Sequence, residues 1–263
     1  MDNIDFTSVT EITGYNVTTE QLQRMFTRYH FASDFCLQKD VLEVACGTGQ
    51  GLGYLKKKAK KVVGGDFDGK IVRLAQQYYK DRVEIIQLDA HELPFANRSF
   101  DVIICYEALY YLRNPERFLA ESGRVLRENG VLILGTANKD WPGFNPSPYS
   151  YRYFSAHELQ TLLSVNGFEV SLFADCPVRA ETIKEMILSG VKQLAVRLRL
   201  MPKTMKGKEK LKRLFVGKLK TLPPELSENM MPYIPPTPIS TDSIVSDYKV
   251  LFAVGKKRSD MAL

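Results

Sequence analysis

The sequence is poor in cysteine and histidine. Its 263 residues include four cysteines and three histidines, and no cysteines form a C-x-x-C pair. The cysteines are scattered, so neither a disulfide framework nor a zinc site is expected, and no metal is assigned. No apolar run approaches the roughly 18 residues of a membrane span, and no signal-peptide pattern is present. These absences favour a protein of the reducing cytoplasm.

The charge is unevenly distributed along the chain. Hydrophobic residues make up 44% and charged residues 25%, as in ordinary globular proteins, and the formal net charge is +6. Between positions 179 and 220, thirteen Lys or Arg stand against three Glu. Such a segment attracts an anionic glycan, an anionic membrane surface or RNA. RNA is the least expected partner, because no nucleic-acid-binding module accompanies the charges.

Strand-like and helix-like patterns alternate along most of the chain. Strands are expected at 41–46, 62–66, 83–88, 100–106, 131–137, 168–174 and 248–254. Helices are expected at 19–37, after the first strand up to the lysine run at 56–61, at 69–80, from 115 onward and at 155–165. This alternation predicts an α/β fold, with a parallel sheet and helices on both faces.

The first predicted strand runs into a glycine-rich turn, V-L-E-V-A-C-G-T-G-Q-G, which ends at Gly51. Glycine at alternate positions permits unusual φ values and leaves no Cβ between the backbone and a ligand. The dinucleotide fingerprint G-x-G-x-x-G fails, because position 52 is Leu. The turn therefore predicts a binding site for some other ligand.

Two further acidic residues follow the next predicted strands. Asp66 ends the segment K-V-V-G-G-D, where a carboxylate can accept hydrogen bonds from both hydroxyls of a ribose. Asp89, in Q-L-D-A-H-E-L-P-F, can accept from the exocyclic amine of adenine, with apolar contact from Leu88 and Ala90. The three loops together predict a nucleoside site at the carboxyl edge of the sheet.

These motifs resemble the core of class I S-adenosylmethionine (SAM) methyltransferases of the type 11-like, small-molecule and sugar-methylating kind. The shared order is E-x-x-x-G-x-G-x-G, a strand-end Asp, D-A-x-x-L-P-F, S-F-D-x-I and R-V-L-x-x-x-G. The resemblance implies a Rossmann-like seven-stranded sheet with an antiparallel last strand, and SAM as cofactor. It implies an N-terminal cap helix region at 1–38, a core at 39–176 and 247–258, and a basic helical and Pro-rich lid at 177–246.

The resemblance also implies a set of cofactor-binding residues. Glu43 is expected to orient the glycine turn, Phe67 to lie against the adenine, and Tyr15 to close over the amino-acid end. Cys105 and Tyr106, at the end of the fourth strand, are expected to touch the methionine moiety. The full set is Tyr15, Glu43, Ala45, Gly47, Gly49, Asp66, Phe67, Leu88, Asp89, Ala90, Cys105 and Tyr106.

One departure from the family concerns the reaction chemistry. The family often has Glu-His after the fourth strand, and Tyr111 replaces that His here. A general base with a near-neutral pKa is therefore missing from its usual place, although orientation alone can drive displacement at a sulfonium methyl. Tyr111 and His157 are the candidate catalytic residues. The alternative for His157 is a surface position inside a capping box, and His30 is expected on the exposed face of the N-terminal helix.

The acceptor is expected to meet an aromatic loop after the fifth strand. Residues 141–154 hold six aromatics and three prolines. Trp141, Tyr149 and Tyr151 are the candidate acceptor-binding residues, with Phe154 in the core. The alternative is that these rings only cover the edge of the sheet.

Apolar stripes from Ile183 and from Leu211 predict a helical lid with a solvated basic exterior, or a peripheral membrane contact through 179–220. The predicted function is SAM-dependent methyl transfer to a small-molecule acceptor, at a hydroxyl of a sugar or glycan. The alternatives are an N- or O-methyltransferase of a natural product, and a catalytically inactive SAM-binding regulatory protein.

Overall fold

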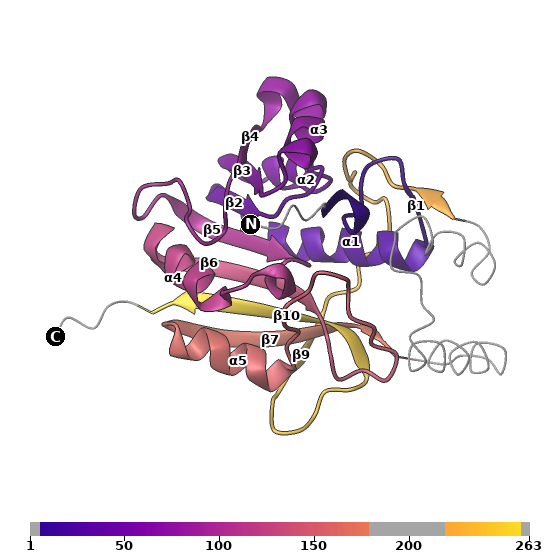
Figure 1. Cartoon of the computed structure of the whole chain (residues 1–263), viewed down its shortest axis with the longest axis vertical. Helices are drawn as coiled ribbons and strands as arrows, with labels where there is room; N and C mark the ends of the chain where they lie inside the picture. The colour runs from indigo at the N-terminus through magenta and orange to yellow at the C-terminus, as the bar shows by residue number, and fades with distance from the viewer. Residues whose placement is uncertain (1–5, 179–218, 259–263) are drawn as a thin grey trace.

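A computed structural model describes residues 6–178 and 219–258 (Figure 1). The α-helices are α1 (Thr19–Ser33), α2 (Leu52–Lys56), α3 (Gly69–Tyr79), α4 (Pro115–Val125) and α5 (Ala156–Val165). Three short 3-10 helices are η1 (Phe6–Ser8), η2 (Lys80–Arg82) and η3 (Leu109–Tyr111). The strands are β1 (Asn16–Val17), β2 (Asp40–Val44), β3 (Lys61–Asp66), β4 (Glu84–Gln87), β5 (Phe100–Tyr106), β6 (Leu126–Ala137), β7 (Phe168–Pro177), β8 (Lys220–Thr221), β9 (Thr237–Ile239) and β10 (Tyr248–Lys257).

The main sheet confirms the predicted parallel core with an antiparallel last strand. Its strand order is β4-β3-β2-β5-β6-β10-β7-β9. The pairs from β4 through β6 are parallel, and β10 runs antiparallel to both β6 and β7. The chain moves outward from β2 to β3 and β4 and then returns to β5 on the other side of β2. This reversal leaves a crevice at the carboxyl ends of β2 and β5, where open α/β sheets bind ligands.

The sheet has one strand more than the seven predicted. β9 comes from the Pro-rich segment and pairs with β7 through three residues, including Pro238 opposite Phe173. Proline is tolerated there because β9 is an edge strand, so its missing N–H breaks no inner ladder. A short proline-containing strand of this kind carries too little alternation to be recognised from the sequence.

Helices cover both faces of the sheet, as predicted. One apolar cluster joins α1, α2 and α3 to one face, and a second joins α4 and α5 to the other (Figure 1). The alternation along β2 explains the two layers, because Val41 belongs to the first cluster and Leu42 to the second. The predicted capping box at Ser155 begins α5, with the Glu158 N–H donating to the Ser155 hydroxyl.

Two helices are shorter than the sequence pattern suggested. α1 ends at Ser33 instead of residue 37, and Gln38 has a positive φ of 57° that a helix does not permit. α2 ends at Lys56 because the Lys60 N–H already donates to the Lys39 carbonyl, which leads the chain into β3. Helical side-chain periodicity continued past both ends, so it misplaced the boundaries.

Residues 219–247, which we call the strap, begin beside β1 and α1 and end at the edge of the sheet (Figure 1). There β9 pairs with β7, and the Thr241 hydroxyl donates to Gln160 Oε1 of α5. β8 pairs with β1, and the Leu226 N–H donates to the Gln50 carbonyl at 2.8 Å. The Gln23 side chain donates to the Pro232 carbonyl at 2.6 Å. The strap therefore ties the N-terminal segment, α1 and the glycine-rich turn together.

The strap also partly covers the His30 side chain. Tyr233 stacks on the imidazole with ring centroids 3.8 Å apart, and His30 Nδ1 lies 2.9 Å from the Tyr54 hydroxyl. His30 is half-buried, so the expectation of an exposed histidine was wrong. The helical pattern of α1 could not reveal this, because the covering ring lies about 200 residues further along the chain.

The predicted apolar stripes of the lid lie outside the described residues, apart from Leu219, and so does the basic stretch at 179–218. The division into cap, core and lid stays a prediction. Within residues 6–178 and 219–258, no helix combines the length and apolarity that a membrane crossing requires.

Candidate functional site

A cleft of about 820 Å³ lies at the carboxyl ends of β2, β3, β4 and β5. Its floor is formed by the residues that end or follow these strands, from Val44 to Glu107. Its roof comes from α1 and from the N-terminal segment, where Phe6 packs edge-on against Phe67 and Tyr111 at centroid distances of 6.3 and 5.7 Å. The cleft is therefore a covered channel at the topological switch point of the sheet.

The glycine-rich turn after β2 contributes Gly47 to the cleft, but not Gly49. Gly47 has a φ of 59°, and a Cβ there would meet no atom closer than 3.6 Å. Gly49 has a φ of 84°, and its Cβ would come within 2.9 Å of the Tyr79 ring. Gly47 leaves backbone open to a ligand, whereas Gly49 lets the turn pack on α3.

Asp66 connects β3 to the glycine-rich turn. Its Oδ2 accepts from the Gly47 N–H at 2.9 Å, and its Oδ1 accepts from the Asp68 N–H at 3.0 Å. Burial raises the pKa of Asp66, and these backbone donors partly offset that effect. Each carboxylate oxygen retains a second lone pair, so the group can still accept from a ligand in the cleft.

Glu43 is buried, but it does not line the cleft. Its Oε1 accepts a hydrogen bond from the Tyr29 hydroxyl of α1. Its Oε2 is buried without a partner in the described part of the chain. Burial raises the pKa of Glu43 to about 7. The side chain thus links β2 to α1 and makes no hydrogen bond to the glycine-rich turn.

We expect Glu43→Gln to flatten the pH dependence of stability in the cofactor-free protein. The folded-state pKa near 7 exceeds the unfolded value near 4.3, so the folded state binds this proton more tightly. Wild-type stability should therefore fall as the pH rises from about 4.3 to about 7. The variant should lose this fall and gain up to about 4 kcal/mol on the wild type by pH 8. Urea unfolding at pH 5 and pH 8 measures the difference, and an equal offset at both would contradict it.

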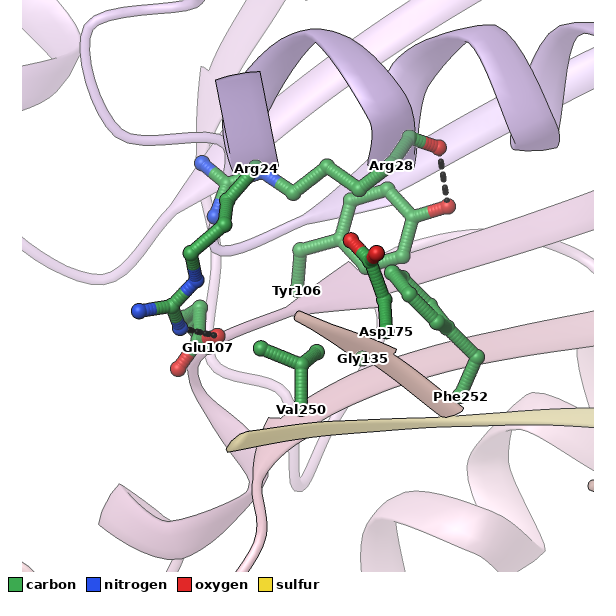
Figure 2. Close-up of a pocket in the computed structure, with 8 residues that line it drawn as sticks. All are labelled: Arg24, Arg28, Tyr106, Glu107, Gly135, Asp175, Val250 and Phe252. Atoms are coloured by element: carbon green, nitrogen blue, oxygen red, sulfur yellow. Dashed lines mark hydrogen bonds and ion pairs between the residues drawn. The ribbon is translucent and has the colours of Figure 1, made fainter. Parts of the chain in front are cut away.

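Two arginines of α1, one turn apart, line the cleft. Figure 2 shows both beside Tyr106 and Glu107, in a smaller pocket that is also lined by Asp175 and Phe252. Arg24 Nη2 lies 3.4 Å from Glu107 Oε1 and forms an ion pair with it. Arg28 makes no ion pair with the residues that the structure describes, and its Nε is buried without a hydrogen-bond partner. Its guanidinium lies over the rings of Tyr29 and Tyr106, at 5.4 and 5.8 Å from their centroids. Among residues 6–178 and 219–258, Arg28 is therefore a cation at the cleft without an ion-pair partner.

The other half of the cleft is lined by tyrosines and small polar groups. The Tyr111 hydroxyl lies 2.5 Å from Ser147 Oγ, and the Ser147 N–H donates to the Tyr153 hydroxyl at 3.0 Å. Tyr153 stacks on Tyr110 with centroids 4.3 Å apart. This wall combines flat aromatic faces with hydroxyl groups, a surface suited to a ring-shaped polar ligand.

Glu107 lines the cleft between its contacts with Arg24 of α1 and Tyr110 of η3. It has a φ of 53°, which is unusual for a residue with a side chain, and its N–H donates to the Gly135 carbonyl. Its Oε2 accepts from the Tyr110 hydroxyl at 3.0 Å, and its side chain is 26% exposed. A strained backbone that holds a partly exposed carboxylate in a cleft is typical of a functional position.

The structure brings most of the predicted site residues together. The cleft is lined by Ala45, Gly47, Asp66, Phe67, Leu88, Asp89, Ala90, Tyr106, Tyr111 and Tyr151. Seven predicted residues lie elsewhere: Tyr15, Glu43, Gly49, Cys105, Trp141, Tyr149 and His157.

The seven outliers have identifiable positions. Cys105 points to the α4 and α5 face, because side chains alternate along β5. Tyr15 is half-buried, and its carbonyl accepts from the Leu222 N–H of the strap. His157 is exposed on α5, on the far side of the sheet from α1. Trp141 lies beside Lys249 of β10, and Tyr149 is 48% exposed.

Arg24, Arg28, His91 and Glu107 line the cleft but were not chosen from the sequence. The arginines occupy polar positions of an amphipathic helix, where a solvated face is the ordinary interpretation. Glu107 belongs to the segment after the fourth predicted strand, where the site was expected. The absence of the family's histidine at position 111 could have pointed to Glu107 as the alternative proton acceptor. Within the described ranges, no group of three or more His, Cys, Asp or Glu side chains could hold a metal ion.

The strand order, the antiparallel β10 and the glycine-rich turn define a Rossmann-like class I methyltransferase fold. Residues 42–134 match the model of a methyltransferase domain family. The chain therefore carries a domain of the class I SAM-dependent methyltransferases, and methyltransferases of this family use SAM as cofactor.

Two curated relatives and one solved structure illustrate the similarity. A probable SAM-dependent methyltransferase of Mycobacterium tuberculosis (strain H37Rv) is 35% identical over 137 residues, which cover 51% of this chain and 50% of that protein. The phthiotriol/phenolphthiotriol dimycocerosates methyltransferase of Mycobacterium leprae is 40% identical over 97 residues, 36% of each chain.

The solved structure is a SAM-dependent methyltransferase of Thermotoga maritima, described as a possible histamine N-methyltransferase. It superposes with a TM-score of 0.57 at 17% identity, covering 91% of this chain and 96% of that one. This likeness concerns the fold alone. The chain spans about half the length of the first curated relatives it matches.

Proposed function

We propose that the protein transfers the methyl group of SAM to a hydroxyl of a small, ring-shaped polar acceptor of the sugar or glycan type. The observation that carries this proposal is that one cleft is lined both by the predicted nucleoside-binding residues and by tyrosine and serine hydroxyls, which we assign to two halves. One half holds the nucleoside-binding residues predicted from the sequence, and the other holds the wall of tyrosine and serine hydroxyls. Glu107 lines the same cleft and contacts Arg24 on one side and Tyr110 on the other.

The nucleoside end of SAM fits the carboxylates after β3 and β4. Asp66 accepts from the ribose hydroxyls, since each of its oxygens has a lone pair left beside the backbone donors. Asp89 accepts from the exocyclic amine of adenine, and Leu88, Ala90 and Phe67 contact the adenine plane. Phe67 is 48% exposed without a ligand, so this ring has apolar surface left to cover.

The methionine end of SAM fits the α1 side of the cleft. The Nε of Arg28 is buried without a hydrogen-bond partner among the described residues, so an anion bound there would be stabilised. The α-carboxylate is the only anionic group of SAM. Gly47 and Ala45 offer open backbone next to this position. When bound, SAM supplies a methyl group on a sulfonium leaving group.

The residues of the acceptor half orient the hydroxyl and receive its proton. Tyr111, Ser147 and Tyr153 supply donors and acceptors that position a polar ring. Glu107 is the carboxylate nearest to this wall, held by Tyr110 and Arg24, and it can accept the proton that the hydroxyl loses. This carboxylate replaces the histidine that the sequence lacks at Tyr111. His157 plays no part in the proposal.

Incubation with tritium-methyl SAM and a panel of saccharides, glycolipids and phenols tests the proposal. Transfer of label to a hydroxyl, with loss of transfer in the absence of protein, is the expected result. Label on amines alone would replace it by the N-methyltransferase alternative. Calorimetric binding of S-adenosylhomocysteine without transfer to any acceptor would favour the regulatory alternative. The phthiotriol dimycocerosate named for the M. leprae relative is a useful lipid member of the panel.

A further inference from the structure

His91 follows β4 in the nucleoside half of the cleft and binds the neighbouring Asp89 twice. Its N–H donates to Asp89 Oδ1 at 2.8 Å, and its ring Nδ1 lies 2.7 Å from the same oxygen. Its other ring nitrogen, Nε2, lies 3.3 Å from the backbone N of Asn114. The Arg117 Nε donates to the His91 carbonyl at 2.7 Å, so the start of α4 holds this residue from a second direction.

These contacts determine which ring nitrogen of the neutral imidazole carries the proton. A backbone N–H can only donate, so the Asn114 N–H requires a lone pair on His91 Nε2. The proton of the neutral ring is then on Nδ1, from which it is donated to Asp89 Oδ1. Asp89 Oδ1 thus receives two hydrogen bonds. Its Oδ2 accepts none from residues 6–178 or 219–258, and both residues line the cleft.

We propose that His91 is a positioning residue that fixes the Asp89 carboxylate, so that Oδ2 alone is presented to the exocyclic amine of the cofactor's adenine. This inference rests on the proposed function, which places the adenine at Asp89. An ionised carboxylate with one saturated oxygen is an acceptor only. It therefore selects a 6-amino purine and rejects a 6-oxo purine, whose oxygen would face a second acceptor without a proton between them.

The Asp–His pair could be mistaken for a catalytic base. In such a pair the histidine nitrogen that is remote from the carboxylate takes the substrate proton. Here that nitrogen is occupied by the Asn114 N–H, and the pair lies beside Leu88 and Ala90 instead of the Ser147 wall. His91 acts on recognition through Asp89 and does not touch the transferred methyl group.

The test measures binding of S-adenosylhomocysteine and of S-inosylhomocysteine, its 6-oxo analogue, by calorimetry. We expect the wild type to favour the 6-amino ligand by at least about tenfold, the effect of one hydrogen bond to a charged acceptor. His91→Phe retains the ring shape without the donor, and its preference should fall to about threefold or less. His91→Asn places an amide N–H close to the position of Nδ1 and should restore most of the wild-type preference.

The possible results separate the role of His91 from the assignment of the cofactor site. An unchanged preference in His91→Phe, or a loss in His91→Asn as large as in His91→Phe, would overturn the positioning role. A protein that binds neither ligand in its wild-type form would instead refute the proposed cofactor site. Urea unfolding of both variants guards against misfolding. Because the ratio of two affinities is measured on the same protein, a smaller folded fraction does not change it.

Discussion

Asp66→Ala is expected to weaken binding of S-adenosylhomocysteine by at least about 100-fold. Two hydrogen bonds from ribose hydroxyls to a charged acceptor contribute about 1.5–3 kcal/mol each, or about 3–6 kcal/mol together. The alanine also removes the acceptor of the Gly47 N–H, which lies 2.9 Å from Asp66 Oδ2 and holds the glycine-rich turn. Isothermal titration calorimetry gives the dissociation constants of both proteins.

A ligand control separates the ribose contact from damage to the turn. The analogue of S-adenosylhomocysteine that lacks both ribose hydroxyls should bind wild type and Asp66→Ala with similar affinity. A variant that loses as much affinity for this analogue as for the parent ligand would show that Asp66 acts only through the Gly47 turn. An unchanged affinity for the parent ligand would refute the ribose assignment altogether.

Arg28→Met is expected to weaken S-adenosylhomocysteine binding by about 30-fold or more. Truncating one partner of a buried, hydrogen-bonded charge pair costs about 2–5 kcal/mol. Methionine keeps an unbranched apolar stem at this position of α1, so the fold of the helix should survive. The cofactor-free variant should be at least as stable as the wild type, because it no longer buries an unpartnered Nε.

Arg24→Met is the matched control, because Arg24 lies one turn earlier on α1 and is already paired with Glu107. Its effect on ligand binding should be the smaller of the two. The decarboxylated analogue, which keeps the amine, should bind wild type and Arg28→Met alike. If Arg28→Met lost equal affinity for both ligands, the guanidinium would have no special role at the carboxylate, and the cofactor would have to lie differently in the cleft.

The sheet was predictable from the sequence because its signals are local. The largely apolar segment 100–106 reappears as β5 with the same ends, and Asp66 and Asp89 both reach the cleft from strand ends. A parallel sheet gathers the carboxyl ends of its strands at one edge. The proximity of residues from separate motifs could therefore be predicted without information on the tertiary contacts.

The rest of the site depends on contacts that no local pattern contains. In the sequence, Arg28 and Glu43 look like ordinary polar residues of a helix and a strand. Their tertiary surroundings distinguish them, because each has a buried atom without a hydrogen-bond partner among the described residues. His91 gains its role from Asn114, more than twenty residues further along the chain. His157 and Cys105 lie away from the cleft because both are on the α4 and α5 side of the sheet, and residue type alone does not determine this.

The place of β10 has a consequence for how the chain reaches its native state. β10 lies between β6 and β7, but it is synthesised last of the three, some seventy residues after β7. While the ribosome is still adding those residues, β6 and β7 each expose an unpaired edge that can recruit strands from other chains. The sheet can close only after Tyr248–Lys257 has left the exit tunnel, so we expect chaperones to bind the chain while these edges are exposed.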